Sequence, residues 1–532
     1  MLAQIGACIG REFDHDLLVA VSPLPEPDLS RALDRLLASD LVVRRSHPSG
    51  VTYAFKHALI QDVAASTLLK SRRAKLHAHI AAALESRFPA VVERQPELLA
   101  RHLSEAGFHE RAVDWWLRAG RIARGRSANK EAIGHLTKAL TSLSSTSQGE
   151  ARDRQELEVQ VTLGPSLIAT EGFCAPQVET VYARIEQLAR HLGHERYRAR
   201  ALRGLCYVYH VRGDLPRAQE IGEDLLNLVE LHDDPIRQAD AHHALGFTLF
   251  HTGRHDLART HLETARAQIE RAGGPHEAFA SGFNIYVHGR AYASHAMWHL
   301  GLDDAALLVM EQAIGFARQL DHPFSLAVTL AYAAMLHQFR EEPAAVRTQA
   351  TAAHALCAEH GFSYYLAWAT IMNGWAIAQE GSLGEGIARL REGLDDFCAI
   401  GAGLRLPYYF WLLAGLHTAS QQLDEAGATL AKADAAARRY GESWADSRLR
   451  LLEGELSLLS GRREAAEACF RRAVGIARAQ GAASLARQAM ARLGHHLRQE
   501  GRSAEAEEIL SGHEASREPG VDPGSMDATR PR

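Results

Sequence analysis

Histidine is the residue type whose number and spacing first suggest chemistry in this sequence. The chain of 532 residues contains 29 histidines. His295 and His299 lie four residues apart on a predicted helix, a spacing that lets both imidazoles face one metal ion. No carboxylate or third histidine stands at a fixed spacing beside them, so we favour packing in the core or in a groove over metal binding. The same interpretation covers the other close histidine pairs, His251/His255 and His242/His243.

Sequence motifs for catalysis are absent. The chain has no G-x-x-x-x-G-K-[ST] phosphate loop, no H-E-x-x-H metal motif and no G-x-S-x-G nucleophile motif. Its six cysteines form no C-x-x-C pair and have no zinc-ligand spacing. We therefore expect no catalytic residue, no metal site and no cofactor in this chain, and we predict that the chain alone is not an enzyme.

Aromatic residues fall on the first helix of many repeated segments, the helix that lines the concave surface of a helical solenoid. Rigid rings give contact area at a low entropy cost, which suits the anchoring of a partner peptide. Packing between repeats is the alternative, and it is favoured for any single ring. The candidates for a partner groove are Tyr209, Phe250, Tyr292, Trp298, Trp368, Trp375, Tyr409 and Trp411.

A turn signal recurs between residues 206 and 510. It closes one apolar helical segment and opens the next at Gly213, Gly253, Gly301, Arg340, Gly381, Gln421, Gly461 and Gly501, with steps of 40, 48, 39, 41, 40, 40 and 40 residues. Five positions later a small residue recurs, where two helices cross closely: Ala218, Ala258, Ala306, Ala345, Gly386, Ala426, Ala466 and Ala506. Each hairpin cannot bury its apolar face alone, so this period predicts an all-α fold, a right-handed solenoid resembling tetratricopeptide repeats.

Residues 1–90 have a different pattern. Two β-rich runs, 41–45 and 51–55, flank a turn with proline and glycine and predict a β-hairpin. Helical segments precede the hairpin, and a helix begins after it near His57. Helix, helix and hairpin in this order are typical of a winged-helix domain.

The rest of the chain divides by composition. Residues 91–149 hold the first repeat-like helices and a linker rich in serine and threonine. Residues 150–510 form the solenoid, with helix breaks expected at 164–165 and 172–176 and an insertion at 273–282. Residues 511–532 are rich in glycine, proline and charge, so we expect a disordered tail.

The formal net charge is −5, so the chain has no strong positive potential that would attract nucleic acid or an anionic membrane. We interpret the basic runs at 70–75 and 118–126 as solvent-exposed faces of helices. Residues 2–10 lack the basic start of a signal peptide, and no window of 18 apolar residues free of charge occurs. We expect a cytoplasmic protein with no membrane partner and no nucleic-acid partner.

Several short runs together resemble the C-terminal half of bacterial signalling proteins. These proteins join a class III adenylate/guanylate cyclase domain, an AAA-like ATPase of the STAND type and a tetratricopeptide array. The resemblance covers about residues 2–510 and is carried by residues 9–13, 53–62, 68–73, 76–77, 95–100, 112–120, 163–165, 322–327 and 468–471. It implies a winged helix that closes an ATPase module, followed by a repeat array.

His57 matches a family histidine at the start of the helix after the wing, which contacts bound nucleotide and senses its state. The resemblance therefore implies a nucleotide-sensing role for His57, with a structural role as the alternative. The cyclase domain and the ATPase core lie outside this sequence, so the chain looks like a fragment, a split gene or a late start. ATP or ADP would bind only if another chain supplied that core.

Three functions follow as hypotheses. The first is a non-catalytic regulatory module that binds a protein or peptide in its solenoid groove and relays the signal to a nucleotide-dependent switch in a separate ATPase/cyclase chain. The second is a piece of a nucleotide cyclase or ATPase. The third is an ATP-dependent transcriptional regulator of the STAND type, which would need a C-terminal helix-turn-helix that residues 511–532 are too short to form.

Overall fold

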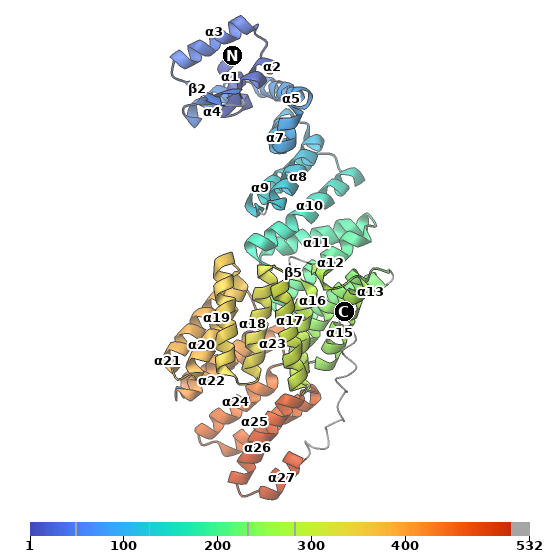
Figure 1. Ribbon diagram of the computed structural model, residues 1–532, viewed down its shortest axis with the longest axis vertical. Coiled ribbons are helices and arrows are strands. Elements are labelled where there is room, and N and C mark those ends of the chain that lie inside the picture. Colours follow the sequence, from blue (N-terminus) through green and yellow to red (C-terminus); the bar gives the residue numbers. More distant parts are fainter. Residues whose placement is uncertain (48–49, 127, 231–232, 281–282, 512–532) are drawn as a thin grey trace. The chain divides into compact units, whose positions relative to one another are not determined.

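The computed structural model describes residues 1–47, 50–126, 128–230, 233–280 and 283–511 (Figure 1). Helices dominate these residues, as the repeat pattern predicts, and their contacts form two compact units. Unit 1 comprises Met1–Gly172 and Gln177–Arg198, and unit 2 comprises Phe173–Pro176 and the residues from Ala199. The sequence suggested a division at residue 149. The predicted disordered tail lies outside the described residues except for Ser511.

Unit 1 begins with a small mixed region and continues with helices. Its elements are α1 (Leu2–Ile9), β1 (Glu12–Asp14), α2 (His15–Val21), α3 (Glu26–Ala38), β2 (Val42–His47), β3 (Gly50–Phe55), α4 (Ala58–Ser66), α5 (Lys70–Arg87), α6 (Pro89–Arg94), α7 (Pro96–Ala106), α8 (His109–Gly125), α9 (Asn129–Leu143), α10 (Glu150–Glu171) and α11 (Pro176–His191).

The small sheet of unit 1 is antiparallel, with strand order β1-β3-β2. Strand β2 pairs with β3 from Val42↔Phe55 to His47↔Gly50, which confirms the predicted hairpin, although its turn residues 48–49 lie outside the described ranges. Strand β1 adds a third strand through Phe13↔Tyr53. Strand β1 was not predicted, because three residues are too short to show an alternating pattern.

Helix α10 is continuous where a break was predicted at residues 164–165, so that prediction is wrong. Residues 164–165 lie inside a continuous helix of 22 residues, with Pro165 in its interior. Gly164 lies beneath the ring of Tyr182, where a Cβ atom would come within 3.0 Å of the ring. The glycine therefore serves the packing of α10 against α11 and does not end the helix.

Unit 2 is an array of helical hairpins. Its elements are α12 (Glu195–Arg212), α13 (Leu215–Glu230), α14 (Pro235–His251), α15 (His255–Arg271), η1 (Pro275–Glu277), β4 (Phe279–Ala280), β5 (Phe283–Asn284), α16 (Ile285–His299), α17 (Asp303–Gln319), α18 (Pro323–Phe339), α19 (Pro343–His360), α20 (Ser363–Gln379), α21 (Leu383–Ala399), α22 (Leu406–Ala419), α23 (Leu423–Tyr440), α24 (Asp446–Leu459), α25 (Arg463–Ala479), α26 (Ala483–Gln499) and α27 (Ser503–Ser511). The short elements η1 and β4 lie in the predicted insertion at 273–282, of which residues 281–282 are not described, and β5 follows directly after it.

Left-handed residues mark the turns of this array at a regular interval. A residue with positive φ occurs every 20 residues at Gly301, Asp321, Glu341, Gly361, Gly381, Gly401, Gln421, Gly441, Gly461, Gly481 and Gly501. A left-handed residue just after a helix lets its amide cap the helix and reverses the chain. Since most of the intervening helices have 17 or 18 residues, about one short turn completes each interval.

One turn lies a single residue later than predicted, at Glu341 in place of Arg340. Glu341 has the left-handed conformation, with φ of 57°, and Arg340 does not. No glycine marks this turn in the sequence, so its position was predicted one residue too early. With Glu341 as the mark, the step is 40 residues throughout except for the insertion step of 48. The buried residue five positions later is accordingly Val346 and not Ala345, whereas the seven other small residues are buried as predicted.

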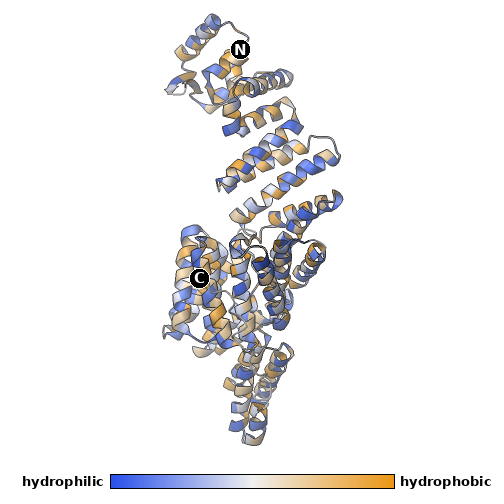
Figure 2. Ribbon diagram, turned by 45° about the vertical axis from the view of Figure 1, so that its right-hand side comes forward, coloured by the Kyte–Doolittle hydropathy of each residue, from blue (hydrophilic) through white to orange (hydrophobic). Residues whose placement is uncertain are grey.

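The two helices of a hairpin have different environments. In α18, 13 of 17 residues are buried, whereas its partner α19 buries four of 18. A helix that is apolar on all sides belongs in an interior. The first helices (α12, α14, α16, α18, α20, α22, α24 and α26) therefore form what we call the inner layer, and hydrophobic residues recur along the whole array (Figure 2). Within the described ranges, no helix is long and apolar enough to cross a membrane.

Candidate partner-binding site

The inner layer of unit 2 is tied together by segments about 190 residues apart. The amide of Gly403 donates to the carbonyl of Val211 at 3.1 Å, and the amide of Ser443 donates to the carbonyl of His251 at 3.0 Å. Val211 and His251 lie at the C-terminal ends of α12 and α14, where carbonyls have no partner within the helix. The loops that follow α21 and α23 thus cap two helices that precede them by nearly five repeats.

Arg405 lies at the centre of this contact. Its side chain is 1% exposed, and its guanidinium donates to the hydroxyl groups of Tyr292 at 2.6 Å and Tyr332 at 2.7 Å. The guanidinium carbon also lies 4.3 Å from the ring centroid of Trp368. Arg405 has φ of 68°, a left-handed conformation that costs a non-glycine residue about 1–2 kcal/mol. Hydrogen bonds and cation–π contacts offset this cost.

Glu442 joins the two capping loops to the inner helices. Its carboxylate accepts the amide of Arg405 at 2.8 Å, the indole N–H of Trp444 at 2.5 Å and, at 2.8 Å, Nδ1 of His251. Burial raises the pKa of Glu442 to about 7, and the hydrogen bonds from Trp444 and Arg405 oppose that rise. Three donors around one carboxylate hold the segments in one geometry.

Histidines of the inner layer serve packing and hydrogen bonding. Nε2 of His295 lies 2.9 Å from the carbonyl of Tyr332, and Nδ1 of His299 lies 2.8 Å from the carbonyl of His295. Burial lowers the pKa of His295 to about 3, so its imidazole is neutral near pH 7. The ring of His255 stacks on His299 at 4.4 Å. In the part of the chain that the structure describes, no group of three or more histidine, cysteine or acidic side chains is arranged to hold a metal ion.

The proposed groove residues are mostly interior. Six of the eight have exposed fractions of 7% or less: Phe250, Tyr292, Trp298, Trp368, Trp375 and Tyr409. Tyr209 and Trp411 are partly exposed. The structure brings Tyr292 and Trp368 together around Arg405, and Trp298 and Trp411 together around Arg448. The buried rings are not presented to a partner here, so their role in partner binding stays a prediction.

Sequence reasoning missed Arg405, Glu442 and Arg448. Arginine and glutamate are common on solvated helix faces, so their types alone gave no signal. The available signal was position, because Arg405 and Glu442 lie in equivalent connections of successive repeats, four residues after Gly401 and one residue after Gly441.

Helix α4 presents a second candidate surface, in unit 1. None of its nine residues is buried, and Leu59 and Val63, one helical turn apart, are 73% and 55% exposed. Leu69, just beyond the helix, is 77% exposed. We call Leu59, Val63 and Leu69 the α4 face. His57 is the N-cap residue of α4 and its side chain is exposed, without a capping hydrogen bond.

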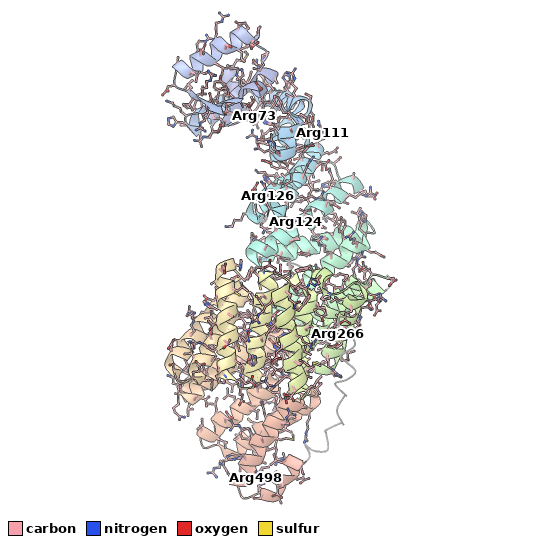
Figure 3. All side chains as sticks on the ribbon, viewed as in Figure 1. Arg73, Arg111, Arg124, Arg126, Arg266 and Arg498 are labelled. Carbon is pink, nitrogen blue, oxygen red and sulfur yellow. The ribbon has the colours of Figure 1, made fainter. Side chains whose placement is uncertain are left out.

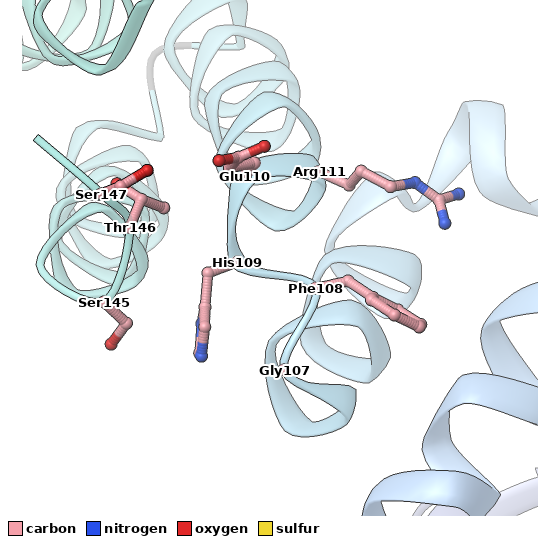
Figure 4. Close-up of a pocket in the computed structure, with 8 residues that line it drawn as sticks. All are labelled: Gly107, Phe108, His109, Glu110, Arg111, Ser145, Thr146 and Ser147. Carbon is pink, nitrogen blue, oxygen red and sulfur yellow. The ribbon is translucent and has the colours of Figure 1, made fainter. Parts of the chain in front are cut away.

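A shallow pocket of about 310 Å³ lies at the turn between α7 and α8. It is lined by Gly107, Phe108, His109, Glu110, Arg111, Ser145, Thr146 and Ser147. Phe108 and Arg111 point away from the three hydroxyl residues (Figure 4). Nδ1 of His109, which also lines the pocket, has no hydrogen-bonding partner among the described residues.

Two of the four arginines in the basic run at 118–126 have acidic partners. Arg121 pairs with Glu158 at 2.5 Å, Arg126 pairs with Glu131 at 3.5 Å, and Arg118 stacks on Trp115 at 5.3 Å. Arg124 and Arg126 lie close to the end of α8 (Figure 3). These contacts fit the prediction of a solvated helix face.

Comparison with protein-family models gives no match. Among curated proteins, an uncharacterized protein of Rhizobium meliloti (strain 1021) is 24% identical over 493 residues, which are 92% of this chain and 48% of that protein. The chain thus spans about half the length of the curated relative that it matches.

Solved structures with helical repeats are also similar to the chain. NprR in complex with its cognate peptide NprX is 12% identical, with 68% of this chain and 98% of NprR covered at a TM-score of 0.47. A Rap protein complexed with competence and sporulation factor is 12% identical, with coverage of 76% and 98% and a TM-score of 0.40. A STAND protein with a tetratricopeptide repeat sensor from Pyrococcus horikoshii is 11% identical, with coverage of 75% and 62% and a TM-score of 0.35. At these values, none of these likenesses carries an argument about function.

Proposed function

We propose that this chain is a non-catalytic regulatory module that binds a partner protein. The observation that carries the proposal is the α4 face, where a helix with no buried residue exposes large apolar side chains. Exposed apolar patches on folded domains mark interaction sites because water contact with them is unfavourable. The repeat array of unit 2 supports the same proposal, since arrays of this kind are built for extended contacts.

The partner that we propose is an ATPase domain of the STAND type on a separate or longer chain. The resemblance of the short sequence runs supports this identity, as does the small region of helices and three strands that precedes α4. In this proposal the region is a winged helix that docks through the α4 face, and exposed His57 contacts a nucleotide phosphate held by the partner. The array would add a protein or peptide signal, and the complex would act in the cytoplasm.

A second candidate function is that the chain forms part of a longer nucleotide cyclase or ATPase. One observation favours it, namely that the Rhizobium meliloti relative is about twice as long as the matched region. In that case ATP would bind outside the described residues, and the regulatory role of this chain would act within one polypeptide.

Binding of a defined partner tests the proposed function. The probe is the part of the Rhizobium meliloti relative that this chain does not cover, supplied as a separate protein and titrated by calorimetry. Val63→Asp should weaken binding at least tenfold, because it places a charge in the apolar contact. Leu308→Asp is the matched control, since Leu308 on α17 is also 55% exposed but lies in unit 2. Equal binding by the two variants would contradict docking through the α4 face.

A further inference from the structure

Arg448, on α24, is a buried cation without a hydrogen-bonding partner for two of its nitrogens. Its side chain is 4% exposed, and Nε and Nη2 have no acceptor among the described residues. Three rings surround the guanidinium carbon, with centroids at 5.1 Å for Trp298, 4.9 Å for Phe339 and 5.0 Å for Trp411. We call these three rings the Arg448 cage.

Arg405 of the same unit is buried as well, and its Nη atoms have acceptors although its Nε has none among the described residues. It donates two hydrogen bonds to tyrosines, and its pKa is raised well above the usual value, with nearby tyrosines opposing the effect of burial. Burial instead lowers the pKa of Arg448 to about 10. Buried N–H groups and a buried charge are costly unless an acceptor compensates them, and the cage rings offer faces but no acceptor atoms.

The identity of the two free donors indicates the ligand. Nε and Nη2 lie on one edge of the guanidinium and form a fork that matches the two oxygens of a carboxylate. Arg184 of the same chain uses these two atoms, donating to Oε1 and Oε2 of Glu156 at 2.6 and 2.8 Å. The same edge of Arg448 is free.

The described charged and titratable groups that act on Arg448 provide no acceptor for its Nε and Nη2. Glu341 attracts the guanidinium electrostatically, but it lies exposed on the turn after α18. Tyr408 also acts on Arg448, and its hydroxyl donates to Gln338 instead. Trp411 is the one cage ring that is partly exposed, and it stacks on Tyr408 at 5.7 Å.

We propose that Arg448 binds a ligand carboxylate through Nε and Nη2 within the cage of Trp298, Phe339 and Trp411. The carboxylate could belong to a small free acid or to the end of a peptide, and the two share this chemistry. Only the peptide source rests on the proposed function. Two of the predicted groove residues, Trp298 and Trp411, thereby acquire a defined role as walls of the site.

Thermal unfolding of the full chain tests the site with acetate as the probe, against chloride at equal ionic strength. Acetate should raise the unfolding midpoint of the wild-type chain by about 2 °C or more, since a ligand that binds only the folded state stabilises it. Arg448→Met should remove this response and should raise the midpoint without acetate, because it removes an uncompensated buried charge.

Arg450→Met is the matched control on the same helix. Arg450 is also buried but pairs with Asp434 and Glu453, so its loss should lower the midpoint and leave the acetate response intact. An acetate response that is equal in the wild-type chain and Arg448→Met would overturn the proposal. So would a wild-type chain that ignores acetate while Arg448→Met behaves like Arg450→Met.

A second arm identifies the source of the carboxylate. Tetra-alanine with a free C-terminal carboxylate is compared with its C-terminal amide, with tryptophan fluorescence as the readout of the cage. A response to the acid and not to the amide supports a peptide carboxylate, and a response to acetate alone supports a small free acid. Because the Val63→Asp titration probes unit 1 separately, the carboxylate site and docking through the α4 face can fail independently.

Discussion

Buried polar side chains in unit 2 differ in how well their neighbours satisfy them. Glu442 receives three donors, and Arg405 reaches two tyrosine hydroxyls. His255 is 0% exposed, and neither of its ring nitrogens has a partner among the described side chains and backbone. Satisfied groups rigidify an interior, whereas unsatisfied ones make it sensitive to pH or ready for a ligand.

Replacement of His255 should reduce the acid sensitivity of the protein. Burial lowers the pKa of His255 to about 3 in the folded chain, so the imidazole stays neutral there. The unfolded chain takes up the proton below about pH 6.5, so the stabilisation is complete above that pH and is lost as the pH falls toward 3. For this one histidine, the loss between pH 6.5 and pH 5 is about 2 kcal/mol.

His255→Phe keeps the stacked packing and removes this loss. Urea unfolding should show that the free energy of unfolding of the variant falls by about 2 kcal/mol less than that of the wild-type chain between pH 7 and pH 5. His495→Phe alters an exposed histidine of unit 2 and should retain the wild-type pH dependence. Parallel pH profiles for the wild-type chain and His255→Phe would contradict the assignment.

The turns between helices of the array fall into two groups, according to whether they contact a later segment of the chain. Some only reverse the chain, as at Gly381, where a Cβ atom would meet nothing within 4 Å. Others also contact a later segment: a Cβ atom at Gly213 would lie 2.8 Å from the ring of Tyr440, and one at Gly253 would lie 2.6 Å from Gln480. The contacted turns lie in the repeats that the capping loops reach.

Replacement of glycine by alanine should cost more stability at a turn that contacts a later segment than at one that does not. Gly213 and Gly381 have φ values of 90° and 107°, so alanine should cost each about 1–2 kcal/mol of stability for the left-handed conformation. Gly213→Ala should cost about 1–3 kcal/mol more, because the new methyl group displaces Tyr440. Denaturant unfolding of the two variants measures the difference. Equal losses would show that the contact between Gly213 and Tyr440 does not form in solution.

At the scale of the whole molecule, the described residues form a repeat array that follows a small region of helices and strands. The described residues hold no metal-ligand group, and the sequence holds no phosphate loop. Its apolar α4 face and its carboxylate site both suit binding. These two features are the basis of our proposal that the chain acts by binding other molecules.

Purified full chain should therefore neither hydrolyse ATP nor form a cyclic nucleotide. Both reactions need phosphate-binding and metal-binding groups, which another chain would have to supply. Phosphate release and cyclic nucleotide production are measured across the fractions of a gel filtration run. Turnover that follows the protein peak would contradict the proposal, and restoration of turnover by a partner chain would support it.

Local pattern in the sequence was sufficient for the hairpins of the array, the 40-residue step and the strand pair of β2 and β3. These features depend on residues within one repeat, on apolar periodicity and on glycine at left-handed turns, so sequence reasoning can find them. It failed at Glu341, where a glutamate takes the position of a glycine, and at β1, which has only three residues.

Only the tertiary structure decided which surfaces are exposed. The sequence alone determined that rings such as Phe250 and Trp368 lie on the first helices of their hairpins, but burial of those helices depends on the curvature that accumulates over several repeats. That curvature brings Gly403 to Val211 and Ser443 to His251, and it turns an expected groove into a packed interior. Contacts between residues so far apart produce no periodic pattern in the sequence, because they depend on the sum of many helix-crossing angles.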